Sequence, residues 1–381
     1  MRFEKILLQV RYIGVIMSKI AILDTEISPR RLHCQRFHAY NVCGLGDGMQ
    51  PKETSHGTVC ARVLDYFASG YELFSIQILN GNGKITDKPM GNIHHLKQGL
   101  ELCMELDVDI VCMSAVSSIL SDSSILYTTV QKLAKKSVLA AALDNRKYIT
   151  IPTAYPFVTG VQSDIRNCLR AGELAYHDRD LFFAGLYANC NIRLLEELGC
   201  PPSNSFAVPV AAARMNTWKN EGKHIDTELH HLKPYPACGI EEEFFFKRGM
   251  GLYRELPLAV LYALGEEDVY AACQAAMDTL YSKYGVQSCA LCSMDAGVDV
   301  RFRKMEPGGD LKRELLFVEC CYKTDLIFFA VRKDGRDRVM AQVDADLEIS
   351  LDKNSVCILF EDGCVKGSTV NLADLVYGIL Q

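Results

Sequence analysis

The stretch Ile20-Ala21-Ile22-Leu23-Asp24-Thr25 decides the fold, because it places a carboxylate directly after an unbroken apolar run. A short aliphatic run without polar alternation is typical of a strand that is buried on both faces of a parallel sheet. The end of such a strand is a rigid platform for a side chain. The sequence therefore predicts that Asp24 is held in a fixed place at one edge of a sheet.

Two later segments each place a polar residue where a helix is expected to begin. They are Ser55-His56-Gly57-Thr58-Val59 and Ser203-Asn204-Ser205-Phe206-Ala207-Val208-Pro209. Thr54 and Ser55 are both candidate N-caps for the first helix. We place Pro209 in the first turn of the second helix, where a missing N–H costs little. His56 and Ser205 can then project toward Asp24.

These three residue types serve one kind of chemistry when they meet. A serine hydroxyl is a weak nucleophile until an imidazole takes its proton. The imidazole needs a buried carboxylate to fix its tautomer and to stabilise its charged form. Each short motif alone also occurs by chance at strand ends and helix caps. Their order along the chain, Asp24, His56 and Ser205, makes the catalytic interpretation the stronger one.

With this order of residues the chain resembles the subtilisin-like serine proteases. The resemblance implies a catalytic triad of Asp24, His56 and Ser205 that hydrolyses peptide bonds, with a peptide or protein as substrate and no cofactor. The run Ser137–Asn145 resembles the family strand that ends in an oxyanion-binding amide, so Asn145 takes that role; loss of such a donor costs about 100- to 1,000-fold in turnover.

The resemblance also assigns a substrate-binding strand. Val108–Ser114 is similar to the strand that precedes it, so Ser114, Ala115 and Val116 are expected to pair with the substrate backbone. Tyr155–Val161 resembles the next core strand of the family. The predicted fold is therefore α/β, a subtilisin-like parallel sheet with helices on both faces.

The chain departs from the family at three glycine positions. Glu26, Asp144 and Ser203 stand there, and each removes backbone freedom where a positive φ can be needed. Glu26 and Asp144 also add negative charge near the site, which is expected either to raise the pKa of His56 or to select basic substrates. These changes support an alternative, a catalytically weak or inactive binding protein on a protease-like scaffold. All three triad members are present, so we favour a serine endopeptidase dedicated to processing, with trimming of a precursor peptide as one candidate role.

Length and composition argue against several other classes of protein. The 381 residues exceed one ordinary core, and the net charge of -6 argues against a general nucleic-acid binder. The 16 cysteines lie largely in apolar patterns, where a free thiol packs as a small hydrophobe, so a reducing cytoplasm fits better than secretion. No run is long and uncharged enough to cross a membrane. Oligomeric state stays open.

The chain divides into four segments by its patterns. Residues 1–16 are an N-terminal extension, which we expect either to be untranslated, with translation starting at Met17, or to be a short flexible segment. Residues 17–220 form the catalytic domain and 221–255 a linker with an apolar docking patch. Residues 256–381 form a smaller α/β or α+β domain, which we expect to recognise the substrate or a partner.

Cysteine and histidine spacing predicts no metal site. Cys289-Ala290-Leu291-Cys292 is a C-x-x-C motif, but the adjacent pair Cys320-Cys321 is expected on a strand, where its side chains point to opposite faces. At most one of that pair can join Cys289 and Cys292. Core packing is therefore the expected role of these thiols.

Overall fold

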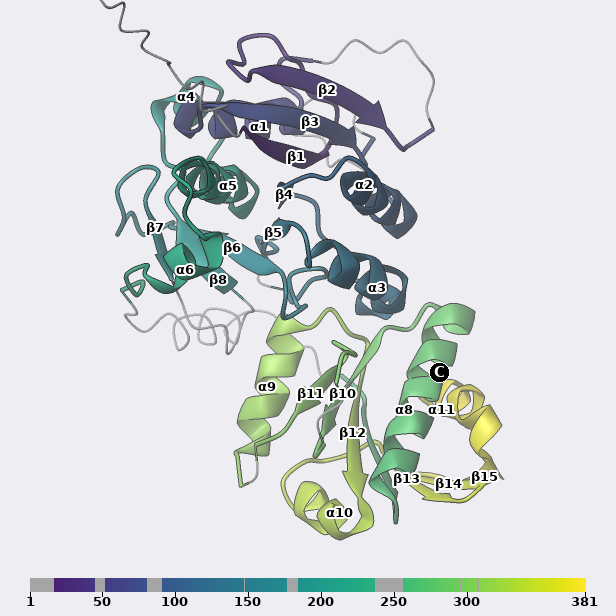
Figure 1. The fold of residues 1–381 in the computed structure, drawn as a ribbon. Coiled ribbons are helices and arrows are strands. Elements are labelled where there is room, and N and C mark those ends of the chain that lie inside the picture. The colour runs from purple at the N-terminus through teal and green to yellow at the C-terminus, as the bar shows by residue number, and fades with distance from the viewer. Residues whose placement is uncertain are drawn as a thin grey trace, which may run out of the picture.

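The computed structural model describes residues 17–44, 52–80, 91–146, 148–176, 184–236, 256–294, 297–306 and 308–381. Two α/β domains follow one another along the chain, each built on one sheet; the first carries the residues for which catalysis is predicted, and we name it the catalytic domain for that prediction. Figure 1 shows the C-terminal domain beside the α3 end of the catalytic domain. The predicted residues 1–16 and the final part of the predicted linker, 237–255, lie outside the described ranges.

The catalytic domain is built on an eight-stranded sheet of order β2-β3-β1-β4-β5-β6-β8-β7. All neighbouring strands run parallel except β7 and β8. The central strands are apolar and buried on both faces, which is the pattern of the parallel sheets of α/β proteins. The strands are β1 (Ser18–Asp24), β2 (Arg36–Asn41), β3 (Tyr71–Gln77), β4 (Ile110–Met113), β5 (Val138–Ala142), β6 (Thr159–Ser163), β7 (Leu174–Tyr176) and β8 (Ala184–Ala188).

Helices cover both faces of this sheet, as the α/β prediction requires. One face packs on α1 (His56–Phe67) and α5 (Asn204–Asn220). The other packs on α2 (Ile93–Glu105) and α3 (Ser123–Leu133), with the short η1 (Leu120–Asp122) in front of α3. The sequence of alternating strands and helices therefore leads to a doubly covered sheet whose carboxyl edge carries Asp24.

Part of the segment expected to be a linker packs on the catalytic domain. The short helix α6 (Ile225–His230), which belongs to this segment, lies on the α5 side, where Ile225 and Leu229 pack against the apolar core; the earlier short helix α4 (Arg193–Glu197) lies on the same side. Tyr235 is buried and stacks on Tyr187 of β8, with ring centroids 3.8 Å apart. Residues 221–236 therefore extend the catalytic domain.

The C-terminal domain has a seven-stranded sheet of order β11-β10-β12-β9-β13-β14-β15, parallel up to β13 and antiparallel beyond it. Helices α8 and α11 lie on one face, and α9 and α10 on the other. The elements are β9 (Leu258–Ala263), α8 (Glu266–Tyr284), β10 (Ser288–Cys292), β11 (Phe302–Lys304), α9 (Leu311–Cys321), β12 (Leu326–Arg332), α10 (Lys333–Met340), β13 (Leu347–Asp352), β14 (Ser355–Phe360), β15 (Gly363–Ser368), η2 (Thr369–Asn371) and α11 (Leu372–Leu380).

The expected strand around Cys320-Cys321 was wrong, because these residues end helix α9. Both thiols are buried in the same apolar cluster, rather than on opposite faces of a strand. A short apolar run fits a buried helix as well as a strand, and here the upstream Asp310 cap begins the helix by accepting from the amides of Lys312 and Arg313.

The two domains share one apolar core. A single cluster of buried residues includes Ile149 and Tyr155 of the catalytic domain together with Phe317 and Cys321 of helix α9. The amide of Ile149 donates to the carbonyl of Cys321 over 2.7 Å. The C-terminal domain therefore supports the loop that follows β5.

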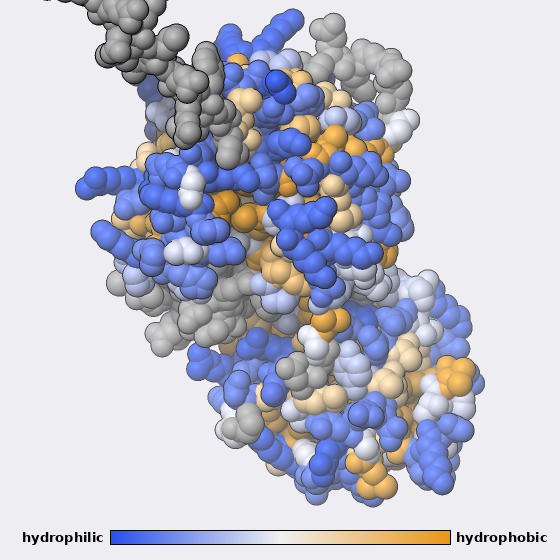
Figure 2. Space-filling view, viewed as in Figure 1, coloured by the Kyte–Doolittle hydropathy of each residue, from blue (hydrophilic) through white to orange (hydrophobic). Residues whose placement is uncertain are grey.

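The visible surface is mostly hydrophilic, with apolar residues in small separate groups, and its outline narrows between the domains (Figure 2). None of the helices in the described ranges has both the length and the apolar character needed to span a bilayer.

Candidate active site

Asp24 is fixed at the end of β1 and is fully buried. One carboxylate oxygen accepts from the amide of Thr25 over 2.7 Å. The backbone carbonyl of Asp24 accepts from the amides of Ile78 and Leu79, beyond the end of β3. The carboxylate therefore has a fixed orientation toward the first turn of α1.

Hydroxyl groups attach the N-terminus of α1 to the segment after β1. Ser55 is the N-cap, as predicted, and its Oγ accepts from the amide of Thr58. The same hydroxyl lies 2.6 Å from the carbonyl of Glu26 as a donor. Thr58 Oγ1 accepts from the amide of Ser28 over 2.9 Å. These bonds explain why a serine and a threonine flank the histidine.

Gly57 is required because the two segments approach closely. A Cβ at this position would collide with the carbonyl oxygen of Thr25. The amide of Gly57 donates to Thr25 Oγ1 over 2.9 Å. The glycine therefore serves a close approach of two backbones, and this contact places His56 over Asp24.

His56 and Asp24 form the pair that a general base requires. The ring Nδ1 lies 2.8 Å from Asp24 Oδ2 and 2.9 Å from Oδ1, so the Nδ1–H donates to the carboxylate. Burial disfavours the charged ring, but the Asp24 charge and its hydrogen bond outweigh it and hold the pKa of His56 well above its usual value of 6.5. The other ring nitrogen, Nε2, is left as the proton acceptor.

Ser205 lies at the second position of α5, with Ser203 as the N-cap. Pro209 is therefore the sixth residue of the helix, and its predicted place in the first turn was wrong because the helix already begins at Asn204. Proline lacks the N–H that would bond the carbonyl four residues earlier, and here that carbonyl belongs to Ser205. Ser114 Oγ and Cys60 Sγ approach it instead, at 3.4 and 3.7 Å.

The imidazole and the Ser205 segment share neighbours. The ring of Phe206 stacks on that of His56, with centroids 5.4 Å apart. Cys60 Sγ lies 3.8 Å from His56 Nδ1 as well as near the Ser205 carbonyl. Within the described ranges no hydrogen bond joins the Ser205 hydroxyl to the His56 ring. In proteases without substrate this bond is often long and tightens only when the substrate binds.

Two asparagines connect the Ser205 helix to the neighbouring strands. Asn145 is exposed at the end of the β5 segment, and its Oδ1 accepts from the amide of Asn204 over 3.1 Å. The buried Asn204 side chain donates to the carbonyl of Leu143 over 3.0 Å and accepts from the amide of Ser163 over 2.8 Å. Because Asn145 uses its oxygen in this way, its NH₂ group remains available as a donor.

The predicted substrate strand has two different parts. Ser114 is buried, and its hydroxyl contacts the Ser205 carbonyl and Cys60. Ala115 and Val116 are half-buried, and no backbone hydrogen bond is found for them among the described residues. Ser117 then pairs with Ile151 in an antiparallel bridge. The free backbone groups of Ala115 and Val116 are therefore those that a peptide strand can bond.

The three residues that replace family glycines adopt ordinary backbone. Positive φ among the described non-glycine residues occurs at Arg31, Asp107, Asn167 and Lys353, not at these three positions. Ser203, for example, has a φ of -150°. The replacements of the glycines by Glu26, Asp144 and Ser203 therefore introduce no left-handed strain.

Sequence reasoning missed two residues of this site, Cys60 and Asn204. Cys60 lies one turn after His56 on the same face of α1, a spacing that the printed sequence shows. Asp24, His56 and Cys60 offer ligand atoms within 4.8 Å of one another, so a metal ion there would compete with the hydrogen bonds of the triad. The role of Asn204 depends on contacts with distant strands, and no local pattern signals it.

No described protein family matches the sequence, and no curated protein is similar to it. Many solved structures are similar in fold, and three proteases are among them. They are the prenylagaramide maturation protease PagA (TM-score 0.35, 13% identity, 54% of this chain and 77% of that one), a lanthipeptide protease (0.40, 17%, 56% and 79%) and the self-cleaved protease domain of PatA (0.34, 14%, 54% and 82%). We base the function on the side-chain geometry described above.

Proposed function

We propose that this protein is a serine endopeptidase of the subtilisin type. The observation that carries the proposal is the bidentate contact of the buried Asp24 carboxylate with His56 Nδ1, at 2.8 and 2.9 Å, beside the helix that presents Ser205. A buried carboxylate on one ring nitrogen leaves the other as a base, and Ser205 is the nucleophile within the same cluster.

Each group has a defined role in this proposal. Asp24 holds the imidazole and stabilises its charged form. His56 takes the proton of Ser205 during attack and then gives it to the leaving amine. The Asn145 NH₂ group and the Ser205 amide stabilise the oxyanion, and the positive end of the α5 dipole adds to this. Ala115 and Val116 bind the substrate backbone.

A dedicated processing role fits the organisation of the chain. The second domain shares its core with the loop that follows Asn145, so substrate recognition and catalysis are joined in one body. Trimming of a precursor peptide is the substrate class that we propose. The missing hydrogen bond between Ser205 and His56 favours the alternative, a weak or inactive protein that binds peptides, and the experiment must separate the two.

Labelling by a fluorophosphonate probe makes that separation, because the probe reacts only with an activated serine. We expect the intact chain to be labelled, and Ser205→Ala and His56→Ala to lose the label. Ser203→Ala is a matched control, because this half-buried N-cap makes no side-chain capping bond, so its labelling should persist. A folded protein that takes up no label, or a label that survives in Ser205→Ala, contradicts the proposal.

A further inference from the structure

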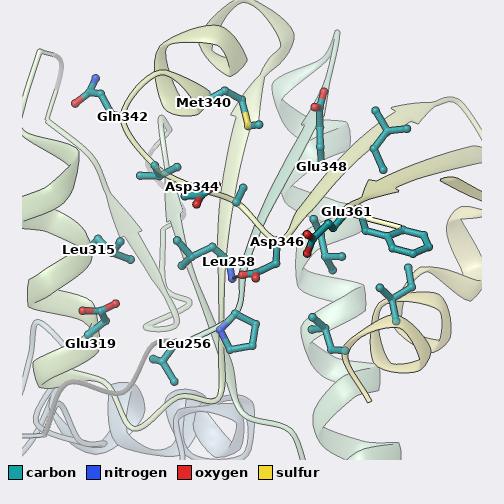
Figure 3. A pocket seen from close by; sticks show the side chains of 18 of the residues that line it. Leu256, Leu258, Leu315, Glu319, Met340, Gln342, Asp344, Asp346, Glu348 and Glu361 are labelled. Atoms are coloured by element: carbon teal, nitrogen blue, oxygen red, sulfur yellow. Dashed lines mark hydrogen bonds between the residues drawn. The ribbon is translucent and has the colours of Figure 1, made fainter. Parts of the chain in front are cut away.

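A cavity of about 1250 Å³ opens in the C-terminal domain, away from the triad. Figure 3 shows it between Leu315 and Glu319 of α9 on one side and Glu348 and Glu361 on the other, with Leu256 and Leu258 between them. We call it the acidic groove. Its volume exceeds the roughly 300–1,000 Å³ typical of small-molecule pockets, so a longer ligand such as a peptide fits it better.

The floor of the acidic groove is apolar because the sheet continues beyond its helices. On the groove face, α9 and α10 pack over β9, β10 and β12, and the sheet continues beyond them to β13 and β14, where Arg336 of α10 reaches Glu348 of β13. Side chains alternate along these strands, so Ile358 of β14 points into the core beneath α8 while Leu359 points into the groove and is 44% exposed. Leu315 of α9 and Met340 of α10 are half-buried apolar residues of the walls beside this floor.

The rim of the acidic groove carries excess negative charge. Six carboxylates line it with one lysine, Lys312; the acids are Glu319, Asp344, Asp346, Glu348, Glu361 and Asp362. Part of this charge is already bound within the protein. Arg336 Nε donates to Glu348 over 2.8 Å, and Asp346 accepts from the amide of Leu258 over 2.8 Å.

Three carboxylates at the mouth have no such partner. Asp344, Glu361 and Asp362 are exposed, and no hydrogen bond or ion pair is found for them among the described residues. They come from two separate loops, the one before β13 and the turn between β14 and β15. An apolar floor with uncompensated acids at its mouth is complementary to a chain that carries both apolar and cationic side chains.

We propose that the acidic groove binds a basic peptide segment in which lysine or arginine alternates with apolar residues. Apolar side chains cover Leu359, Leu315 and Met340, and the cations meet Asp344, Glu361 and Asp362. Phosphate groups are repelled here, so a nucleic acid is excluded as the ligand. That this segment belongs to the substrate rests on the proposed function; binding at a second site would raise the effective concentration of the scissile bond at the triad.

The test measures binding to the full chain carrying Ser205→Ala, so that no cleavage interferes. Fluorescence anisotropy compares a labelled peptide of alternating lysine and leucine with a peptide of equal length that alternates glutamate and leucine. We expect the lysine peptide to bind, with an affinity that falls at high salt, and the glutamate peptide to bind at least tenfold more weakly. Equal binding of both peptides overturns the proposal.

Two triple variants locate the binding. Asp344→Asn/Glu361→Gln/Asp362→Asn removes the free charges of the groove mouth, and we expect at least a tenfold loss of affinity. Glu267→Gln/Glu306→Gln/Asp352→Asn changes the charge equally at exposed positions of the same domain outside the groove, and should bind as well as the parent. Equal losses of affinity in the two variants would show that the net charge of the protein alone attracts the lysine peptide, and would overturn the assignment of the groove as its binding site. Leu359→Ser should weaken binding independently of salt.

The outcomes separate this site from the proposed function. Probe labelling at Ser205 does not involve the acidic groove, and peptide binding in Ser205→Ala does not involve the triad. If the protein binds the lysine peptide but takes no label, the groove stands and the protease assignment fails. If the protein is labelled but does not bind the lysine peptide, the protease assignment stands and the groove proposal fails. In an active protein, joining the lysine segment to a generic substrate should lower KM in the parent but not in the groove variant.

Discussion

The two sheets of this protein have the same parallel core but very different carboxyl edges. In the catalytic domain that edge presents Asp24, His56 and a serine hydroxyl without a hydrogen bond to the ring. In the C-terminal domain the groups at the same edge are bonded to one another. Ser293 Oγ donates to Glu266 over 2.8 Å, and Arg332 pairs with Asp334 at 2.7 Å. The ability of such an edge to catalyse a reaction therefore depends on the side chains that it carries and not on the parallel sheet itself.

The largest expected effect is on kcat, and it appears when a buried carboxylate in one domain is compared with a buried carboxylate in the other. Asp24→Asn should lower kcat by about 10⁴-fold, because the imidazole loses its orienting and stabilising partner. Asp299 pairs with Arg301 at 2.7 Å and is almost as buried. Asp299→Asn should instead cost about 1–3 kcal/mol of unfolding free energy with little change in kcat, because it weakens a buried ion pair while Arg301 keeps its contact with Asp278.

Steady-state kinetics and thermal unfolding of both variants check this contrast. Similar losses of kcat in the two variants would contradict the prediction that Asp24 acts in catalysis and Asp299 only in stability.

The second prediction compares two buried asparagines of α5. Asn204 fixes the start of the helix, and Asn216, three turns later, donates to the carbonyl of Ser69 over 2.9 Å. Each change to alanine should cost about 1–3 kcal/mol of stability, since it leaves a buried partner unsatisfied. Only Asn204→Ala should also lower kcat, by about 10- to 100-fold at nearly constant KM, because it shifts the Ser205 hydroxyl. Equal kcat values in the two variants would reduce Asn204 to a structural residue.

The third prediction concerns pH. Only neutral His56 can accept a proton, so kcat/KM should rise with pH through the raised pKa of this ring, with its acid limb above about 6.5. The stability contribution has the opposite sign. A folded pKa above the unfolded one stabilises the protein at low pH, and this gain is lost as pH rises through the folded pKa.

Activity profiles and unfolding curves between pH 5 and 10 measure both effects. In His56→Ala the corresponding loss of stability with rising pH should disappear. An acid limb well below 6 would show that the Asp24 charge does not dominate the ring.

The smallest expected effect is that of metal removal. The proposed chemistry needs only the protein side chains, so a chelator should leave the rate of hydrolysis unchanged, and a thiol reductant should also have no effect. Loss of activity after dialysis with chelator, restored by zinc, would instead assign the Asp24, His56 and Cys60 cluster to a metal ion.

Much of the catalytic edge could be predicted from the sequence because its signals are local. An apolar run before Asp24 indicates a buried strand, and Ser55 before His56 indicates a capped helix. These are properties of a few consecutive residues. The α/β class with helices on both faces of the sheet followed from the same local patterns and was confirmed.

The parts that failed depend on distant contacts or on register. Helix α9 and a buried strand have the same apolar signal over so short a run, so Cys320 and Cys321 were placed on the wrong element. Placing Pro209 required the first residue of α5, and helix ends are the least certain feature of a sequence-based prediction. Asn204 acts through strands that lie about 40 to 60 residues earlier in the chain.

The interrupted hydrogen-bond ladder at Pro209 makes α5 less stable than an uninterrupted helix and leaves the Ser205 carbonyl to Ser114 and Cys60. Alanine in a helix interior is favoured over proline by about 3 kcal/mol, so a screen for heat-resistant variants would enrich replacements of this residue. The restored amide would draw the Ser205 carbonyl back into the helix and away from Ser114 and Cys60. Selection for heat resistance alone would therefore give a more stable helix at the expense of the contacts that hold the Ser205 segment.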